Sequence, residues 1–197
     1  MSLKYIYNKF ENMSTDEQYE YIKDLFDHFE IKPLYPIEDN FKDIPGKQSE
    51  FKNPTGYLIL HFLDNMEALV DNYIRSLCIT DTFDTSIDNE ILDVIDQAQA
   101  AITTDSFASM PCLIDQNNDT TFKADMPLVF EFGRHKYRDW SFLKLNPYTL
   151  IPALFRHLYK YYYVSKIDEE TGLSHLAHAQ CNLNMIELIL STRGNNV

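Results

Sequence analysis

The sequence predicts a mainly α-helical protein: a helical bundle with a long irregular connector at about residues 103–125. The chain of 197 residues contains only 5 Gly and 8 Pro, and its apolar residues recur mostly at spacings of three and four. Such spacing is typical of amphipathic helices, and strands are hard to place. Because 45% of the residues are hydrophobic and 14% are aromatic, the chain can bury a sizeable core, as one domain or as two small ones.

Three helices are predicted in the N-terminal half of the chain. Ser14 and Glu17 have the S-x-x-E spacing of a capping box, and an apolar stripe follows them. Prolines recur between residues 31 and 54, so a connector follows the first helix. The second helix has a wide apolar face and is therefore expected to be central. The predicted helices span residues 14–29, 55–77 and 86–102.

Two helices are predicted in the C-terminal part, at residues 148–163 and 174–190. The segment that joins them, residues 164–173, is a short turn with three consecutive acids at residues 168–170. The two helices are therefore expected to pack antiparallel. Residues 103–125 precede this part and are rich in Thr, Ser, Asp and Asn, which is typical of a linker or a long loop. We therefore predict an N-terminal helical region of unassigned role at residues 1–125 and a helical domain at residues 126–197.

The charge of the chain restricts its partners. There are 30 Asp and Glu residues against 17 Lys and Arg residues, a formal net charge of −13. Duplex nucleic acid is bound through Lys and Arg, so direct binding by a broad basic face is not expected. Two interpretations stay open. The acids are partly a metal site and partly solvated surface, or the protein occupies a basic groove on a partner.

The N-terminal residues and the cysteines together indicate a cytoplasmic protein. The N-terminal residues carry charges every few positions, and no apolar run approaches the roughly 20 residues of a membrane span. The three cysteines are odd in number and widely spaced, without a C-x-x-C pair, which favours reduced thiols. Neither secretion nor a membrane anchor is expected.

The stretch DEETGLSHLAHAQCN, residues 168–182, contains a polar seam on an otherwise apolar helix. His175, His178 and Asn182 stand at i, i+3 and i+7, which places the three side chains on one stripe. The other residues of this segment are strongly apolar, so the helix is expected to be buried. A buried polar stripe requires hydrogen-bond partners or a ligand.

Three segments taken in order resemble a known family. They are FEFGRHKYRDW (130–140), LFRHLYKY (154–161) and the stretch at 168–182. Together they resemble the phage-associated dATP/dGTP diphosphohydrolase-like domains, grouped with the all-α, MazG-like nucleoside triphosphate pyrophosphohydrolases, over about residues 126–190. The family pattern has Asn-Trp where this chain has Arg138-Asp139-Trp140, and Gly-Glu where it has Ser165-Lys166. The matching positions are Phe132, Gly133, Lys136, Tyr137, Arg156, His157, Asp168, Glu170, Gly172, His175, His178 and Asn182.

The resemblance implies a metal-dependent nucleotide pyrophosphohydrolase that acts on purine (deoxy)nucleoside triphosphates. Its cofactor would be Mn²⁺ or Mg²⁺, and histidine ligands favour the softer Mn²⁺. Its expected partners are a purine nucleotide and a second copy in a homodimer. A host protein in the host cytoplasm is the partner expected if the chain is instead an acidic inhibitor. The implied residues are catalytic His157, Asp168, Glu170, His175 and His178; substrate-binding Lys136, Arg138, Arg156 and Asn182; and metal-binding Asp168, His175 and His178.

Other interpretations of the same residues stay open. Asp168 to Thr171 would also serve to cap the last helix, with the histidines bonded to buried polar groups. A second acidic set, Asp64 with Glu67 and Glu90 with Asp93, looks similar to the paired carboxylates that chelate Mg²⁺ in MazG-like enzymes, but such spacing is more often the solvated side of a helix. The alternative function is a non-enzymatic acidic phage protein that sequesters a nucleotide or inhibits a host nucleic-acid-binding or defence protein.

Overall fold

The computed structural model describes the C-terminal half of the chain almost continuously and a few positions near the N-terminus. The chain divides into two compact units, Met1–Asp43 with Ser49–Asp88 and Ile44–Gln48 with Asn89–Val197. The helix predicted at residues 55–77 lies outside the described residues, as do Asp64 and Glu67. The described residues are 4, 12–14, 16, 17, 20, 21, 24, 85–106 and 110–194.

The predicted capping box near the N-terminus is confirmed. The backbone N–H and the hydroxyl of Ser14 both donate to Oε2 of Glu17, at 2.7 Å each. In return the backbone N–H of Glu17 donates to Oγ of Ser14 at 3.4 Å. The reciprocal bonds satisfy backbone groups that have no partner inside the helix, and residues 16, 17, 20, 21 and 24 are helical.

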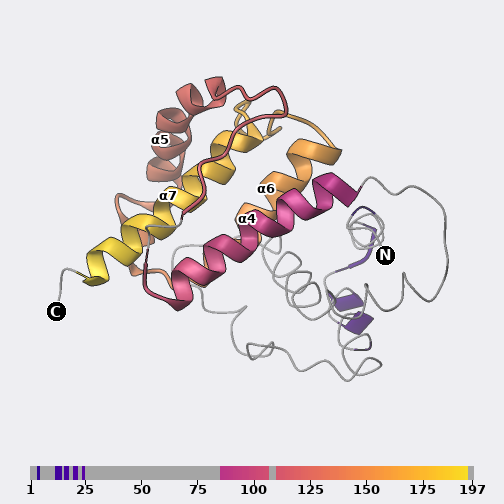
Figure 1. The fold of residues 1–197 in the computed structure, drawn as a ribbon. Helices are drawn as coiled ribbons and strands as arrows, with labels where there is room; N and C mark the ends of the chain where they lie inside the picture. Colours follow the sequence, from indigo (N-terminus) through magenta and orange to yellow (C-terminus); the bar gives the residue numbers. More distant parts are fainter. Residues whose placement is uncertain are drawn as a thin grey trace. The chain divides into compact units, whose positions relative to one another are not determined.

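The second unit is helical, which confirms the predicted mainly α class (Figure 1). Strand pairing in the described part of the chain is limited to one isolated bridge between Ile167 and Ser174. Short 3-10 turns stand at Thr121–Asp125, Ser141–Lys144 and Pro147–Leu150. The α-helices are α4 (Thr85–Thr103), α5 (Met126–Tyr137), α6 (Ile151–Tyr163) and α7 (His175–Gly194).

Helix α5 has no counterpart among the predicted helices, because its sequence, MPLVFEFGRHKY, contains both a proline and a glycine. Pro127 stands in the first turn, where its missing N–H would have no helical partner in any case. Gly133 lies in the middle of the helix and lowers its intrinsic propensity. Packing of α5 against α7 compensates for this low helix propensity, since one side of the helix, including Val129, faces the interior.

Helices α6 and α7 form the antiparallel hairpin that the sequence predicted, and theirs is the most extensive contact between described elements. Helix α7 lies between α5 and α6 (Figure 1) and is buried over most of its length, as expected of a central helix. His157, in the second half of α6, contacts His175 and His178 at the start of α7. The hairpin core is formed by Leu154, Phe155, Leu158, Tyr159, Leu176, Ala177, Ala179, Leu183, Ile186, Ile189 and Leu190.

Helix α4 runs antiparallel to the segment that contains α6. The hydroxyl of Tyr162 donates to Oε1 of Glu90 at 2.8 Å, and Oγ1 of Thr103 lies 2.9 Å from the Tyr148 hydroxyl. The two bonds join opposite ends of α4 to α6 and to the turn before it. Glu90 is therefore engaged by a tyrosine, while Asp93 of the second acidic set is exposed.

The segment at 103–125 is a loop folded onto α7 in its described part. The backbone N–H of Leu113 donates to Oε1 of Gln180 at 2.8 Å in a buried position. Further along, Oδ1 of Asp115 accepts from the backbone N–H of Asn117 at 2.8 Å and of Asp119 at 2.6 Å, which closes a turn. These bonds fix the loop against the helical hairpin.

No helix in the described part of the chain is long and apolar enough to cross a membrane.

Candidate functional site

The loop between α6 and α7 holds Asp168 close to the first turn of α7. The backbone N–H of Asp168 donates to Leu173 O at 2.8 Å, and that of Gly172 donates to Asp168 O at 2.8 Å. The N–H of His175 donates back to Lys166 O at 2.9 Å. Gly172 has φ +71°, a conformation that glycine adopts without steric cost. The sequence E-T-G therefore supplies the residue that this tight loop requires.

Ser174 caps α7 and links it to the start of α5. Its Oγ accepts from the backbone N–H of Leu176 at 3.2 Å, the side-chain bond expected of a helix cap. Its own N–H donates to Oδ2 of Asp125 at 3.0 Å. Because Ser174 caps the helix, the side chain of Asp168 faces other partners.

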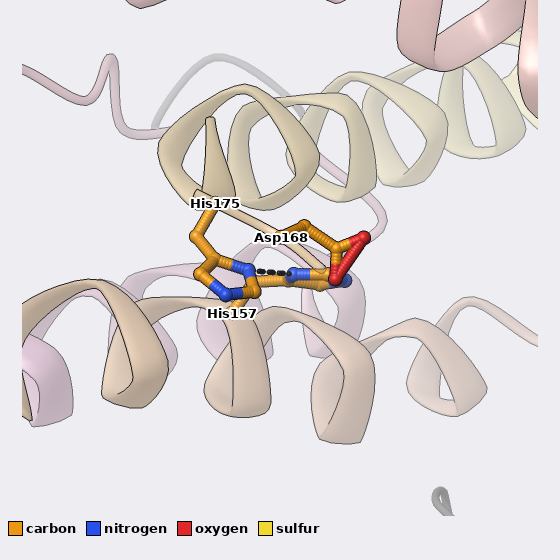
Figure 2. Close-up of side chains that lie close together, drawn as sticks. All are labelled: His157, Asp168 and His175. Atoms are coloured by element: carbon orange, nitrogen blue, oxygen red, sulfur yellow. Dashed lines mark hydrogen bonds between the residues drawn. The ribbon is translucent and has the colours of Figure 1, made fainter. Parts of the chain in front are cut away.

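His157, Asp168 and His175 form a compact cluster from three elements (Figure 2). Each offers a ligand atom, and these atoms lie within 4.8 Å of one another. The Nδ1 atoms of His157 and His175 face each other at 2.9 Å. His157 is 8% exposed and His175 is fully buried, while the Asp168 side chain retains 13% exposure. The cluster is therefore largely shielded from water.

His178 and Thr171 form a second layer behind this cluster. The His178 ring stacks on His157 with centroids 4.6 Å apart and planes 7° apart. Its Nε2 lies 2.8 Å from the hydroxyl of Thr171, which donates to Oδ2 of Asp168 at 3.1 Å. The direct separation of His178 Nε2 from Asp168 Oδ2 is 3.7 Å. Thr171 thus bridges two residues that are too far apart for a hydrogen bond of their own.

The imidazoles of His175 and His178 favour their neutral form. Burial lowers the pKa of His175 to about 4; Asp168 opposes this shift, and the positive charge of Lys160 adds to it. Burial also lowers the pKa of His178; Asp168 again opposes the shift and Arg156 adds to it. A neutral imidazole has one ring nitrogen with a free lone pair, which is the form that binds metal ions.

The donor set fits a divalent cation of intermediate softness. The Nδ1 atoms of His157 and His175 are joined by a hydrogen bond of 2.9 Å, and a cation bound at both atoms would take the place of that hydrogen. His175 Nε2 is buried and has no hydrogen-bond partner among the described residues. Two imidazoles and one carboxylate suit Mn²⁺, Fe²⁺ or Zn²⁺ better than Mg²⁺, which prefers oxygen.

The segment that contains this cluster matches a known protein family. Residues 115–196 match the family model described as dATP/dGTP diphosphohydrolase, N-terminal. The match, which covers somewhat less than half of the chain, supports a dATP/dGTP diphosphohydrolase-like domain at these residues. The match includes α5, α6, α7, the cluster, the 3-10 turn Thr121–Asp125 and the loop residues 115–120. Searches of curated proteins and of solved structures found no match.

Three of the predicted site residues lie at the outer side of the diphosphohydrolase-like domain. Lys136, near the end of α5, donates to Oε1 of Glu170 at 2.8 Å, and the two side chains are 30% and 46% exposed. Glu170 is therefore engaged by a cation at the surface, and its negative charge opposes the lowering of the pKa of His178. Arg138 follows the end of α5 with φ 76° and is exposed. Lys136 thus supplies positive charge beside the loop that carries Asp168.

The other two predicted residues adjoin His178. Arg156 is partly buried on α6, and its charge contributes to the lowered pKa of His178. Nδ2 of Asn182 donates to the backbone carbonyl of His178 at 2.9 Å, one turn earlier in α7. Asn182 is 6% exposed, so the polar seam predicted on α7 is partly satisfied by its own helix.

Thr171 is absent from the set of site residues predicted from sequence. It stands three residues after Asp168 and seven before His178, and this spacing carries no signal because the loop has no regular period. The compact cluster also differs from the metal-binding set predicted from sequence. The sequence placed His178 with Asp168 and His175, whereas His157 is the histidine that completes the compact cluster.

The lowered histidine pKa values predict loss of stability in acid. Because His175 has a pKa of about 4 when folded and about 6.5 when unfolded, the unfolded chain binds more protons between these values. This contribution to stability is complete above pH 6.5 and is lost as the pH falls to 4. For metal-free protein we expect His175 to account for about 3 kcal/mol of this loss. Urea denaturation between these pH values measures it.

The variant His175→Asn tests whether His175 causes this acid-dependent loss of stability, since the Asn amide approximates the position of Nδ1 but does not titrate. Its unfolding free energy is expected to fall less steeply with acid than that of the wild type. His135→Asn is the matched control, because the His135 side chain is 72% exposed. Equal pH dependence in wild type and His175→Asn would contradict the prediction.

Proposed function

We propose that the diphosphohydrolase-like domain hydrolyses purine deoxynucleoside triphosphates with a divalent metal, releasing the monophosphate and pyrophosphate. The observation that carries the proposal is the buried cluster of His157, Asp168 and His175 inside the segment that matches this family. The family description names dATP and dGTP as substrates. The cluster supplies the two nitrogens and the carboxylate that a hydrolytic metal needs.

The metal would be held by His157, Asp168 and His175. A divalent cation there would supply positive charge for the phosphate oxygens and acidify a water molecule. In the reaction, water adds to the α-phosphorus, the bond from this phosphorus to the bridging oxygen breaks, and pyrophosphate leaves. A largely buried site strengthens such electrostatic interactions, because little water screens them.

The cations around the loop would bind the phosphates. We take Lys136, Arg138 and Arg156 as these cations: Lys136 contacts the loop that carries Asp168, and Arg156 is close enough to affect the pKa of His178. Lys136 is paired with Glu170, so binding of a triphosphate would replace a carboxylate by phosphate oxygens at the same ammonium group. The chain has a formal net charge of −13, so this local group of cations counters the general repulsion of a nucleotide.

A substrate panel tests the proposal directly. Wild-type protein would be incubated with each of the four deoxynucleoside triphosphates, with Mn²⁺, with Mg²⁺ or with EDTA, and pyrophosphate release would be measured. We expect release from dATP and dGTP with Mn²⁺, weaker release with Mg²⁺ and none with EDTA. Thermal shift in the same conditions reports binding, since a ligand of the native state raises the melting temperature.

The same panel distinguishes the enzyme from the alternative function. The net charge of −13 permits a non-enzymatic acidic protein that sequesters a nucleotide or blocks a basic groove on a host protein. Stabilisation by a purine nucleotide without cleavage would favour sequestration. Neither cleavage nor stabilisation by any nucleotide, with either metal, would refute the enzyme and leave the acidic inhibitor as the better hypothesis.

A further inference from the structure

The geometry points to Thr171 as a positioning residue that orients the carboxylate of Asp168 and sets the tautomer of His178. The inference deepens the proposed function, and its part concerning metal affinity rests on that proposal. The evidence lies in the contacts of a single hydroxyl group. This oxygen lies 3.1 Å from Asp168 Oδ2, 2.8 Å from His178 Nε2 and 3.3 Å from the backbone nitrogen of Leu173.

The three contacts determine which group donates. A threonine hydroxyl has one hydrogen and two lone pairs. The N–H of Leu173 is a donor, so it takes one lone pair. An ionised carboxylate only accepts, so the hydroxyl hydrogen is directed to Asp168. The remaining lone pair accepts from His178, which must therefore carry its hydrogen on Nε2.

This assignment excludes Nε2 of His178 as a metal-binding atom and gives the residue another role. The His178 ring lies parallel to His157, with centroids 4.6 Å apart, and so limits the orientations open to that imidazole. Thr171 holds His178 from one side, and Asn182 bonds its backbone carbonyl. The orientation of His157 thus depends on a chain of contacts that begins at Thr171.

The same hydroxyl restricts Asp168. Its hydrogen bond to Oδ2 fixes the rotation of a carboxylate that belongs to the cluster. Hydrogen bonds to ligating carboxylates and histidines orient them, and their loss typically lowers metal affinity by about 10–100-fold. Thr171 makes such bonds to one cluster residue directly and to another through the stacked ring.

Three variants separate this role from a general effect on the loop. Thr171→Val keeps the branched shape but removes the hydroxyl, and Thr171→Ser keeps the hydroxyl. Thr121→Val is the matched control, because the Thr121 hydroxyl donates to Oδ2 of Asp119 at 2.9 Å in an exposed turn. The control thus loses the same type of hydrogen bond, from a threonine hydroxyl to an aspartate carboxylate, in a segment that does not contain the histidines.

The first measurement uses metal-free protein. Nitrogen-15 correlation spectra of the histidine rings, recorded at about pH 8, where imidazole is neutral, distinguish the two tautomers. We expect His178 as the Nε2–H form in wild type, Thr171→Ser and Thr121→Val, and a mixed or Nδ1–H form in Thr171→Val. An Nδ1–H form in wild type would overturn the inference, and this holds even if Thr171→Val does not fold.

The second measurement is titration with Mn²⁺, followed by electron paramagnetic resonance of the free ion. Thr171→Val is expected to bind Mn²⁺ about 10–100-fold more weakly than wild type, with Thr171→Ser within a few-fold of wild type. Equal affinity of Thr171→Val and wild type would overturn the positioning role. Failure of the wild type to bind Mn²⁺ would refute the proposed metal site, and the tautomer measurement would then decide the inference alone.

Discussion

Replacement of Asp168 by Asn is expected to lower metal-dependent pyrophosphate release from dATP and dGTP by about 10³-fold or more. The change keeps the size of the side chain but removes the one carboxylate of the cluster. Metal-assisted charge stabilisation is worth several kcal/mol, and each 1.4 kcal/mol or so corresponds to a factor of ten in rate. Pyrophosphate release at saturating nucleotide and Mn²⁺, compared with wild type, measures the effect.

The melting temperature distinguishes a site residue from a structural one. Asp168→Asn is expected to melt within a few degrees of wild type without metal, because Asn retains an oxygen that accepts from Thr171. Asp139→Asn is the matched control, since the Asp139 side chain is 60% exposed and forms a surface ion pair with Arg134 at 3.6 Å. Full activity of Asp168→Asn, or an equal loss in Asp139→Asn, would contradict the proposed metal site.

Replacement of Leu154 by Ala is expected to have the opposite effect, a large loss of stability with the metal site intact in the folded protein. Leu154 is fully buried in the contact between α6 and α7. A Leu→Ala change in a core costs about 2–5 kcal/mol, because apolar contacts are lost and a cavity is left. For a chain of this size, this corresponds to a decrease of roughly 4–20 °C in melting temperature.

Leu188→Ala is the matched comparison for Leu154→Ala. Leu188 stands on α7 with 38% exposure, and the same substitution there is expected to change stability by less than about 1 kcal/mol. Both sites are helical, so the difference in helix propensity between Leu and Ala is the same and cancels. Circular dichroism recorded during thermal unfolding compares the melting temperatures of the two variants. Equal melting temperatures would show that the α6–α7 contact contributes little to stability.

Much of the helical architecture was predictable from local signals. The capping box at Ser14 and Glu17 is a pattern of two residues whose bonds form within one turn, so it needs no tertiary context. The helices α4, α6 and α7 match periodic segments, and their ends shift by a few residues at most. Helix α5 was missed because its proline and glycine lower the local preference, and contact with α7 offsets this.

The residue types of the site were also predictable, but their geometry was not. The spacing of His175 and His178 places both on one stripe of α7, and the acidic turn places Asp168 nearby. Which histidine joins the cluster depends on how α6 is rotated against α7 and on the side-chain rotamers. His157 meets His175 through Nδ1, while His178 stacks behind His157. No spacing rule within one helix contains that information.

Local sequence patterns were enough to predict the helical class, the antiparallel hairpin of α6 and α7, and the group of histidines and acids from which the candidate site is built. These features follow from period, capping and loop length, which are properties of neighbouring residues. Tertiary structure alone decided that His157, Asp168 and His175 meet, that Lys136 pairs with Glu170, and that the loop residue Thr171 bridges Asp168 and His178. Such contacts depend on distances between side chains from different elements, and these distances are set by the packing of the whole domain.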